Sequence, residues 1–283
     1  MIEVLEVGGS ALVQDLGRPG RSHLGVSPSG AADRGALLMA NAAIGNVPGA
    51  AALEVIGAFS ARAQEDLMVG VAGALAPVMV DGVATDARVI ALAAGTVISW
   101  APPRWGLRTY LAVRGGLDTP PVLGSRSTDV LSGLGPEPVR AGDVLVGLGE
   151  TGPVPTSDDR PGGAHPASLV MLDATTGPRA DWLADPDDLY HRPWRASALA
   201  DRVGLRLEGE PLRRAITREL PSEGVVTGSV QVPPSGEPVI LGPDHPVTGG
   251  YPVVAVLTAA ACDAVAQLRP GATVRFRRAG RSR

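Results

Sequence analysis

The chain has 283 residues, which is enough for one large domain or two ordinary domains, each with its own hydrophobic core. Hydrophobic residues make up 45% and charged residues 19% of the sequence, a balance that excludes an intrinsically disordered protein. All 25 basic residues are Arg, and the missing Lys excludes a Walker-type phosphate loop, a Schiff-base enzyme and a covalently biotinylated carrier. The net charge of −4 argues against a nucleic-acid-binding surface.

The composition favours a mainly β protein. The 37 Gly and 26 Pro exceed average usage, and such frequent turn residues are typical of many short strands. The chain has one cysteine, Cys262, so an internal disulfide is excluded, as expected for a protein of the reducing cytoplasm. Cys262 lies in an apolar run, which is typical of a buried structural thiol. Residues 35–53 form the longest uncharged stretch, but Asn41, Asn46 and Pro48 interrupt it, so it does not resemble a membrane span. We therefore expect a soluble cytoplasmic protein.

The helices are expected to be few and short. The first spans residues 34–44, where apolar residues recur near helical spacing, with Asp33 as the N-cap and Gly45 as the stop. A short amphipathic helix is expected over residues 180–190. Another helix is expected over residues 258–268, with Thr258 as its N-cap and Pro270 closing it. These few helices cannot form the framework of a chain of this length.

The other apolar segments predict strands. Residues 1–7 alternate with a period of two, and they carry two acids where a secretion signal needs a basic flank. The clearest further strands cover residues 67–71, 78–80, 97–100, 108–113, 144–148, 168–172, 204–207, 239–241 and 273–276. Their number and the turns between them predict two antiparallel β barrels or sandwiches.

Two domains are expected, over residues 1–150 and 166–283. Residues 151–165 are rich in Pro and Gly and lack apolar periodicity, so they predict a linker or an exposed loop. Residues 92–100 and 268–276 share a Leu, a Gly turn and an alternating run that ends in an aromatic residue, and residues 139–146 form a weaker copy. Internal duplication and exchange of segments between the domains both remain open.

The first of three polar clusters in Gly-rich turns covers residues 14–33. It contains Asp15, Arg18, Ser29 and Asp33, and its composition is typical of an ordered loop rather than a flexible linker. A ligand-binding role and a plain Asp15–Arg18 salt bridge that pins a turn both remain open.

The second cluster covers residues 108–116 and 123–128. A strand beginning near Arg108 runs into a Gly-Gly pair, and a later turn contains Arg126 and Ser127. Backbone N–H groups, hydroxyls and a guanidinium together suit a carboxylate or a phosphate. Turns of Ser, Thr and Gly are common, so this pattern alone has low specificity.

The third cluster covers residues 231–236 and 242–252. Two adjacent glycines stand between Thr248 and Tyr251, which indicates unusual backbone geometry or the close approach of a ligand. A plain turn needs only one glycine, so this pattern favours a binding site. The four histidines of the chain are never spaced as neighbouring metal ligands, and we expect no metal site.

The clusters belong to a pattern that covers nearly the whole chain in order. Its motifs are Gln14-Asp15-x-Gly17-Arg18-x-Gly20, Ser29-Gly30-Ala31-x-Asp33, Ala40-Asn41, Gly45-Asn46, Leu53-Glu54, Tyr110-Leu-Ala-Val-x-Gly-Gly116, Leu123-Gly-Ser-Arg-Ser-Thr128, Asp201-Arg202-Val-Gly204, Gln231-Val-Pro233 and Thr248-Gly-Gly-Tyr-Pro252. This pattern resembles the allophanate hydrolase subunit 2 family, which includes the carboxyltransferase domain of urea carboxylase. The chain departs from it at Arg21, where an aromatic residue is frequent, and at Ala32, where Met is common.

The resemblance implies two cyclophilin-like β-barrel domains with a few short helices. It also implies one subunit of an ATP-dependent 5-oxoprolinase complex, which opens 5-oxoproline to L-glutamate together with the A and B subunits, of which the B subunit is Kip-inhibitor-like. The sequence does not identify the subunit that binds ATP, and covalent biotin is excluded on this chain. Two alternatives remain open: a regulatory protein that antagonises a Kip-like inhibitor of a histidine kinase, and a biotin-dependent carboxyltransferase that acts with a carrier in trans.

The candidate site residues come from the three clusters and the matching motifs. As catalytic residues we predict Asp15 or Asp244 as general base or water-orienting group, with Tyr251 and Thr248 as hydrogen-bond donors. Arg18 and Arg126 would hold carboxylate or phosphate oxygens. The predicted substrate- or phosphate-binding residues are Arg18, Ser29, Asp33, Asn41, Glu54, Arg108, Arg126, Ser127, Gln231, Thr248, Gly249 and Gly250.

Overall fold

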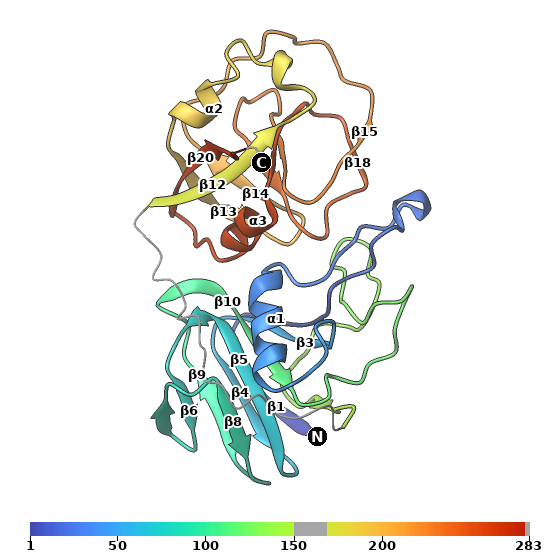
Figure 1. Cartoon of the computed structure of the whole chain (residues 1–283), viewed down its shortest axis with the longest axis vertical. Coiled ribbons are helices and arrows are strands. Elements are labelled where there is room, and N and C mark those ends of the chain that lie inside the picture. Colours follow the sequence, from blue (N-terminus) through green and yellow to red (C-terminus); the bar gives the residue numbers. More distant parts are fainter. Residues whose placement is uncertain (150–168, 281–283) are drawn as a thin grey trace. The chain divides into compact units, whose positions relative to one another are not determined.

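The computed structural model describes residues 1–149 and 169–280, which form two compact units (Figure 1). Among these residues the first unit contains Met1–Arg18, Asp33–Asp129 and the stretch that follows from Gly133. The second unit contains the C-terminal half together with two segments of the N-terminal half, Pro19–Ala32 and Val130–Ser132. The predicted linker over residues 151–165 lies outside the described residues.

Two β-sheets build the described part of the first unit. The strands of the six-stranded sheet are, in spatial order, β11 (Val144–Leu145), β1 (Ile2–Val7), β4 (Phe59–Ala63), β9 (Val97–Trp100), β6 (Val78–Val80) and β7 (Val83–Thr85). The strands of the five-stranded sheet are β2 (Ser10–Gln14), β3 (Ala52–Ile56), β10 (Trp105–Val113), β5 (Leu67–Leu75) and β8 (Val89–Leu92). All pairs in both sheets are antiparallel, and the sheets share one hydrophobic core.

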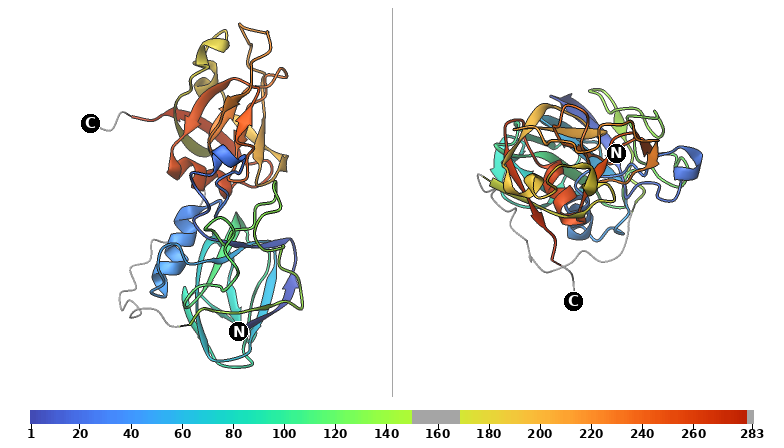
Figure 2. Two further views of the ribbon diagram at one scale, coloured as in Figure 1. Left: turned by 90° about the vertical axis from the view of Figure 1, so that its right-hand side faces the viewer. Right: turned by 90° about the horizontal axis from the view of Figure 1, so that it is seen from above.

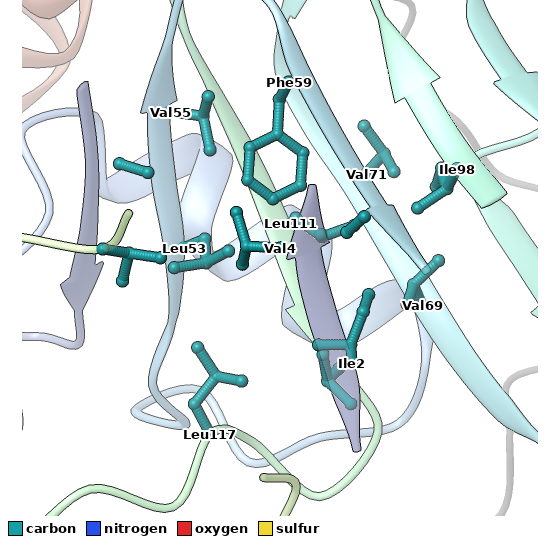
Figure 3. Close-up of a cluster of buried hydrophobic side chains, with 14 of the residues drawn as sticks. Ile2, Val4, Leu53, Val55, Phe59, Val69, Val71, Ile98, Leu111 and Leu117 are labelled. Atoms are coloured by element: carbon teal, nitrogen blue, oxygen red, sulfur yellow. The ribbon is translucent and has the colours of Figure 1, made fainter. Parts of the chain in front are cut away.

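Apolar side chains from both sheets form the core of the first unit (Figure 3). Val4 and Phe59 come from the six-stranded sheet, and Leu53, Val69 and Leu111 come from the five-stranded sheet; all are at most 1% exposed. Full burial of such a side chain contributes about 1.5–3 kcal/mol. The alternation of buried and exposed residues along β1 is the reason that its sequence predicts a strand.

The helix α1 (Arg34–Ala43) packs against β5 and β10 of the first unit (Figure 2). Its predicted N-cap is confirmed, because the Asp33 side chain accepts a hydrogen bond of 2.8 Å from the Ala36 N–H. The helix lies so close to β5 that a Cβ at Gly70 would stand 2.2 Å from the Ala40 carbonyl oxygen. Only glycine at this position permits the contact.

The second unit contains a closed β-barrel. Its strands, in order around the barrel, are β12 (Leu169–Thr176), β19 (Val253–Leu257), β16 (Ser229–Gln231), β17 (Val239–Leu241), β14 (Gly204–Glu208), β13 (Trp194–Ala200) and β20 (Thr273–Arg278). The prediction of purely antiparallel pairing is wrong at one place, since β12 and β20 pair in parallel. A parallel pair needs a long crossover connection, and most of the second unit lies between these two strands in the chain.

The helix α3 (Ala259–Ala266) accompanies the barrel and confirms the helix predicted over residues 258–268. Thr258 caps it, with its hydroxyl 3.3 Å from the Ala261 N–H. Burial, and then the neighbouring charge of Asp263, raises the pKa of the Cys262 thiol to about 11, so the thiol stays protonated at neutral pH. This is the behaviour expected of a structural cysteine.

The helix predicted over residues 180–190 is not continuous. A 3₁₀ turn, η2 (Ala180–Trp182), is separated from a short helix, α2 (Asp188–His191), by an extended residue, Leu183. Pro186 stands between them, and the residue before a proline disfavours the helical region of the backbone. The remaining short elements are η1 (Ser22–Leu24), β15 (Glu223–Gly224) and β18 (Thr248–Gly249).

Most predicted strands are present with slightly different ends. The predicted strand over residues 144–148 is reduced to β11, and residue 168 of another lies outside the described range. Several Ala-rich strands were not predicted, such as β4 and β13, because alanine gives no β-propensity signal. The fold class is confirmed as mainly β with barrel architecture and short helices. No helix among the described residues is long and apolar enough to cross a membrane.

Candidate functional site

The Asp15 carboxylate fixes a turn more than 100 residues away in the sequence. Asp15 directly follows β2 and is buried. Its Oδ1 accepts hydrogen bonds of 2.6 Å from both the Ser125 and the Ser127 hydroxyls, and its Oδ2 accepts one of 2.7 Å from the Arg126 N–H. Gly17 N–H adds a fourth bond of 2.7 Å. Through these contacts the Asp15 carboxylate holds residues 125–127 in place. The role of Asp15 as a general base stays a prediction.

The turn held by Asp15 has an unusual residue at its tip. Val122 and Ser125 exchange two backbone hydrogen bonds, of 2.8 and 3.2 Å, so Leu123 and Gly124 form a two-residue hairpin turn. Their φ angles are 52° and 88°, both in the left-handed region. Such turns favour Asn, Asp or Gly, and Leu adopts this conformation at a cost in free energy.

Arg18 is buried beneath the same turn. Its Nε donates to the Val122 carbonyl at 3.3 Å, and its Nη2 donates to the Ser127 carbonyl. Its Nη1 lies 3.9 Å from the Asp129 carboxylate. The ion-pair partner of Arg18 is therefore Asp129 and not Asp15, and the guanidinium supports the turn from within.

Arg126, in the turn that Asp15 holds, reaches solvent. Its side chain is 31% exposed, and its Nη2 lies 3.9 Å from the carboxylate of Asp118, which is 52% exposed. Its Nε is buried and has no hydrogen-bond partner among the described residues, and the same holds for the hydroxyl of Thr119. Sequence reasoning missed Asp118 and Thr119, although both closely follow the Gly-Gly pair of the second cluster.

Three further predicted residues meet in a buried network between β3 and β10. The Glu54 carboxylate accepts a hydrogen bond of 3.2 Å from the Arg108 Nε and one of 2.6 Å from the Tyr110 hydroxyl. That hydroxyl accepts a bond of 2.8 Å from the Asp33 N–H at the start of α1. Burial, and then the charge of Glu54, raises the pKa of the Tyr110 phenol well above its usual value of 10.0. The phenol therefore stays neutral and joins α1 to the sheet.

Asn41 and the glycine pair of the second cluster have contacts within the fold. The Asn41 Nδ2 donates to the Ala50 carbonyl at 2.8 Å, and its Oδ1 accepts from the Asn46 Nδ2 at 2.9 Å. A Cβ at Gly115 would stand 1.8 Å from the Gly149 carbonyl oxygen. Close packing of the backbone thus accounts for this glycine, whose sequence context we interpreted as part of an anion site.

In the second unit, Asp244 is fully buried and forms a two-bond ion pair with Arg202. The Arg202 Nε and Nη2 lie 2.8 and 3.0 Å from the two carboxylate oxygens. Ser29, with a φ of 51°, donates its N–H to the Pro243 carbonyl at 3.0 Å. Both contacts are made where the segment Pro19–Ala32 joins the second unit. The role of Asp244 as general base stays a prediction.

The third cluster lies on and beside the short β15–β18 sheet. Gln231 Nε2 donates to the Tyr251 carbonyl at 3.3 Å, and a Cβ at Gly249 would stand 2.5 Å from that same Nε2. Thr248 and Gly250 are exposed, and Tyr251 is 46% exposed. The Thr248 and Tyr251 side chains are therefore open to solvent and accessible to a ligand.

The structure thus divides the predicted residues between the two units. The first unit holds Asp15, Arg18, Asp33, Asn41, Glu54, Arg108, Arg126 and Ser127. The second unit holds Ser29, Gln231, Asp244, Thr248, Gly249, Gly250 and Tyr251. Within the described ranges, no three His, Cys, Asp or Glu side chains gather where they could hold a metal ion.

Comparisons with known proteins give consistent results. The family model for the carboxyltransferase domain, subdomain A and B, matches residues 24–278. The C subunit of 5-oxoprolinase from Escherichia coli (strain K12) is 35% identical over 98% of this chain and 90% of that protein, and the Haemophilus influenzae protein of the same name is 34% identical with the same coverage. The crystal structure of the K. lactis urea amidolyase aligns with a TM-score of 0.89 and 27% identity, over 99% of this chain but 19% of that chain.

The family match extends over far more than half of the sequence, and the E. coli and H. influenzae relatives align over nearly their whole length. The resemblance predicted from the sequence motifs is therefore confirmed. This chain belongs to the carboxyltransferase domain, subdomain A and B, family.

Proposed function

We propose that this chain is one of the subunits of a cytoplasmic, ATP-dependent 5-oxoprolinase that opens 5-oxoproline to L-glutamate. The observation that carries the proposal is its 35% identity to the C subunit of E. coli 5-oxoprolinase across 98% of this chain and 90% of that protein. An alignment of this length leaves little of either chain unmatched, and it favours a shared role over a shared fold alone. The proposed partners are the A and B subunits of the enzyme, of which the B subunit is Kip-inhibitor-like.

The chemistry of the proposed substrate indicates what the complex must provide. A five-membered lactam is a stable amide, so its carbonyl carbon reacts slowly with water. ATP would transfer its γ-phosphoryl group to the lactam oxygen and leave as ADP, which makes the carbonyl carbon open to attack by water. Collapse of that adduct would break the ring C–N bond, with a proton going to the amine, and a second water would hydrolyse the resulting acyl phosphate to phosphate and L-glutamate.

The contribution that we propose for this chain is to bind and orient the anionic substrate. Arg126 is suited to this because its backbone is fixed by Asp15 while its guanidinium reaches solvent. Exact placement of a reacting group converts binding energy into rate.

The test is reconstitution with each of the three chains left out in turn. The chain is coexpressed with the A and B subunits, and 5-oxoproline-dependent ATP hydrolysis and glutamate release are measured together. We expect both activities to require all three chains. If the A and B subunits alone are fully active, the chain has no part in the chemistry, and the regulatory hypothesis, antagonism of a Kip-like kinase inhibitor, replaces this proposal.

A carboxyltransferase acting with a carrier in trans is the second candidate. It is favoured by the carboxyltransferase family match and by the structural similarity to a urea amidolyase. The absence of Lys means that any biotin must be carried by another protein. A pulldown with this chain, probed with avidin for biotinylated proteins, separates the two candidates, since an oxoprolinase subunit should retain no biotinylated carrier.

A further inference from the structure

Leu123 stands at the tip of the turn that Asp15 holds, and we propose that its side chain contacts the apolar ring of the substrate while Arg126 binds the substrate carboxylate. Leu123 is then a specificity-determining residue for a lactam that carries a carboxylate, because it favours a ring with methylene groups. The inference rests on the proposed function, and it gives the leucine a role that the stability of the fold does not explain.

The backbone of Leu123 has a conformation that leucine disfavours. Its φ of 52° lies in the left-handed region, and among the described residues Ser29 and Asp81 are the other non-glycine residues with such an angle. Short polar side chains of this kind can hydrogen-bond to the nearby backbone, which helps them to adopt the left-handed region. A bulky apolar side chain has no such compensation, so Leu123 is unfavourable for the folded state.

The turn that carries this strained residue is held by two buried charged side chains. Asp15 accepts hydrogen bonds of 2.7 Å from the Arg126 N–H and 2.6 Å from the Ser127 hydroxyl. Arg18 donates to the Val122 carbonyl at 3.3 Å and to the Ser127 carbonyl. Asp15 and Arg18 are at most 8% exposed. Strained residues persist where the surrounding structure fixes them in this way, and they cluster at functional sites.

The hydrophobic core gains little from the leucine in return. Leu123 is 38% exposed, and it is not among the side chains that pack together in the described core of the first unit. Asparagine or glycine would adopt the same turn at a lower cost in free energy. Neither core packing nor turn geometry therefore accounts for a leucine at this position, and its solvent-accessible side chain is free to contact a ligand.

Leu123 and Arg126 are near enough to contact one small ligand. The Ser125 and Ser127 hydroxyls point toward Asp15 inside the fold. The Arg126 side chain, which lies between them in the sequence, is 31% exposed. Leu123 precedes Arg126 by three residues, so their Cα atoms are at most about 11 Å apart. This distance is within the combined reach of the two side chains and a five-membered ring.

5-Oxoproline offers one chemical group for each of these side chains. Its planar carboxylate can accept two parallel hydrogen bonds from the Arg126 guanidinium. Its ring carries adjacent methylene groups, which cannot hydrogen-bond and are stabilised when they leave water for an apolar surface such as Leu123. A polar residue at the tip would relieve the backbone but would remove this apolar contact. The ligand thus supplies the reason for leucine that the turn itself lacks.

The test compares stability with the Michaelis constant, KM, in wild type, Leu123→Asn and Leu123→Met. Thermal unfolding is measured on the full chain. The catalytic rate constant, the KM for 5-oxoproline and copurification of the B subunit are measured on the complex of all three chains. Leu38→Asn is the matched control, because Leu38 lies on α1 and has the same exposed fraction of 38%. The control should leave KM unchanged.

Leu123→Asn relieves the backbone, so it should raise the midpoint of thermal unfolding by about 1–4 °C. The same variant should raise KM by about fivefold with the catalytic rate constant unchanged, because the apolar contact is lost. Leu123→Met keeps a flexible apolar side chain on the strained backbone, so its midpoint and its KM should both match wild type. A variant that is more stable and yet binds substrate more weakly has not lost activity by unfolding, which separates a binding role from a structural one.

The outcomes separate this inference from the proposed function. A stabilised Leu123→Asn with an unchanged KM overturns the inference alone, since the complex still turns over 5-oxoproline. A destabilised Leu123→Asn also overturns it, because the leucine then packs against another part of the chain. Loss of the B subunit from this variant overturns it as well and assigns the tip of the turn to a subunit interface. An inactive wild-type complex, or full activity without this chain, defeats the proposed function, and the inference then fails with it.

Discussion

The Arg202 guanidinium and the Asp244 carboxylate form a buried pair that also holds two segments from the N-terminal half of the chain. The two hydrogen bonds between them measure 2.8 and 3.0 Å. Arg202 Nη2 donates in addition to the Gly30 carbonyl, and Asp244 Oδ2 accepts from the Val130 N–H at 3.0 Å. The pair therefore links these two segments to the rest of the second unit. Because the pair is buried, removing either partner should strongly lower the free energy of unfolding.

Replacing Arg202 with Met should lower the free energy of unfolding by about 3–5 kcal/mol, because the Asp244 carboxylate would stay buried without its partner. Equilibrium unfolding in urea measures this loss. Arg277→Met is the matched control: Arg277 makes two hydrogen bonds, of 2.6 and 2.8 Å, to Asp173, but this pair is exposed. Its loss should cost far less stability than the loss of Arg202, because solvent screens an exposed pair, and equal losses in the two variants would contradict the assignment.

Leu123→Asn should stabilise the protein by about 0.5–1 kcal/mol. Leu123 occupies the first position of a hairpin turn with a φ of 52° and is partly exposed, so asparagine relieves the backbone without emptying the core. Thermal and urea unfolding report the change. Asp81 has a φ of 47° in the turn between β6 and β7, and its Oδ1 accepts a hydrogen bond of 2.8 Å from the Val97 N–H. Asp81→Leu should therefore destabilise through both the backbone strain and the lost hydrogen bond. A destabilised Leu123→Asn would show that the leucine packs in an unrecognised contact.

Arg126→Ala should abolish 5-oxoproline-dependent turnover of the reconstituted complex while the B subunit still copurifies with the chain. The guanidinium is partly exposed and its backbone is fixed by Asp15, so its removal deletes a binding group without disturbing the core. Activity and copurification are measured on the same preparation. Full activity in this variant would exclude Arg126 from substrate binding.

Stability should fall steeply above pH 10, and Tyr110 should account for part of the fall. Burial raises the pKa of the Tyr110 phenol in the folded state, so its contribution is fully present below about pH 10 and is lost as the pH rises toward the folded-state value. The slope contributed by one such group is about 1.4 kcal/mol per pH unit. Unfolding in urea between pH 8 and 11 measures it.

Tyr110→Phe is the variant that tests this origin of the alkaline slope. It removes the ionisable group and should flatten the pH dependence, while the lost hydrogen bond to Glu54 lowers stability by about 1 kcal/mol at neutral pH. Tyr251→Phe is the control, because it makes the same chemical change at a tyrosine that is 46% exposed. Identical slopes in the three proteins would show that other groups cause the alkaline loss.

Local patterns in the sequence were enough to predict the class of fold and the N-caps of two helices. Asp33 and Thr258 cap their helices because the contact joins residues three positions apart, a distance that the sequence itself specifies. Frequent turn residues and alternating apolar runs indicated a mainly β protein. The Ala-rich strands β4 and β13 were missed, because their strand conformation comes from pairing with neighbours and not from local propensity.

The partners of the charged residues were decided by the tertiary structure alone. The sequence left open a salt bridge between Arg18 and Asp15, three residues away, but the folded chain brings Asp15 to Ser125 and Arg18 to Asp129. Arg202 and Gly30 are 172 positions apart and meet in the second unit. Contacts of this kind depend on the register of whole sheets and on which unit each segment joins, and no local pattern encodes either. The sequence by itself determined which residue types the clusters contain, and the folded chain decided which of them, such as Arg18, are buried within the structure and which, such as Arg126, reach solvent.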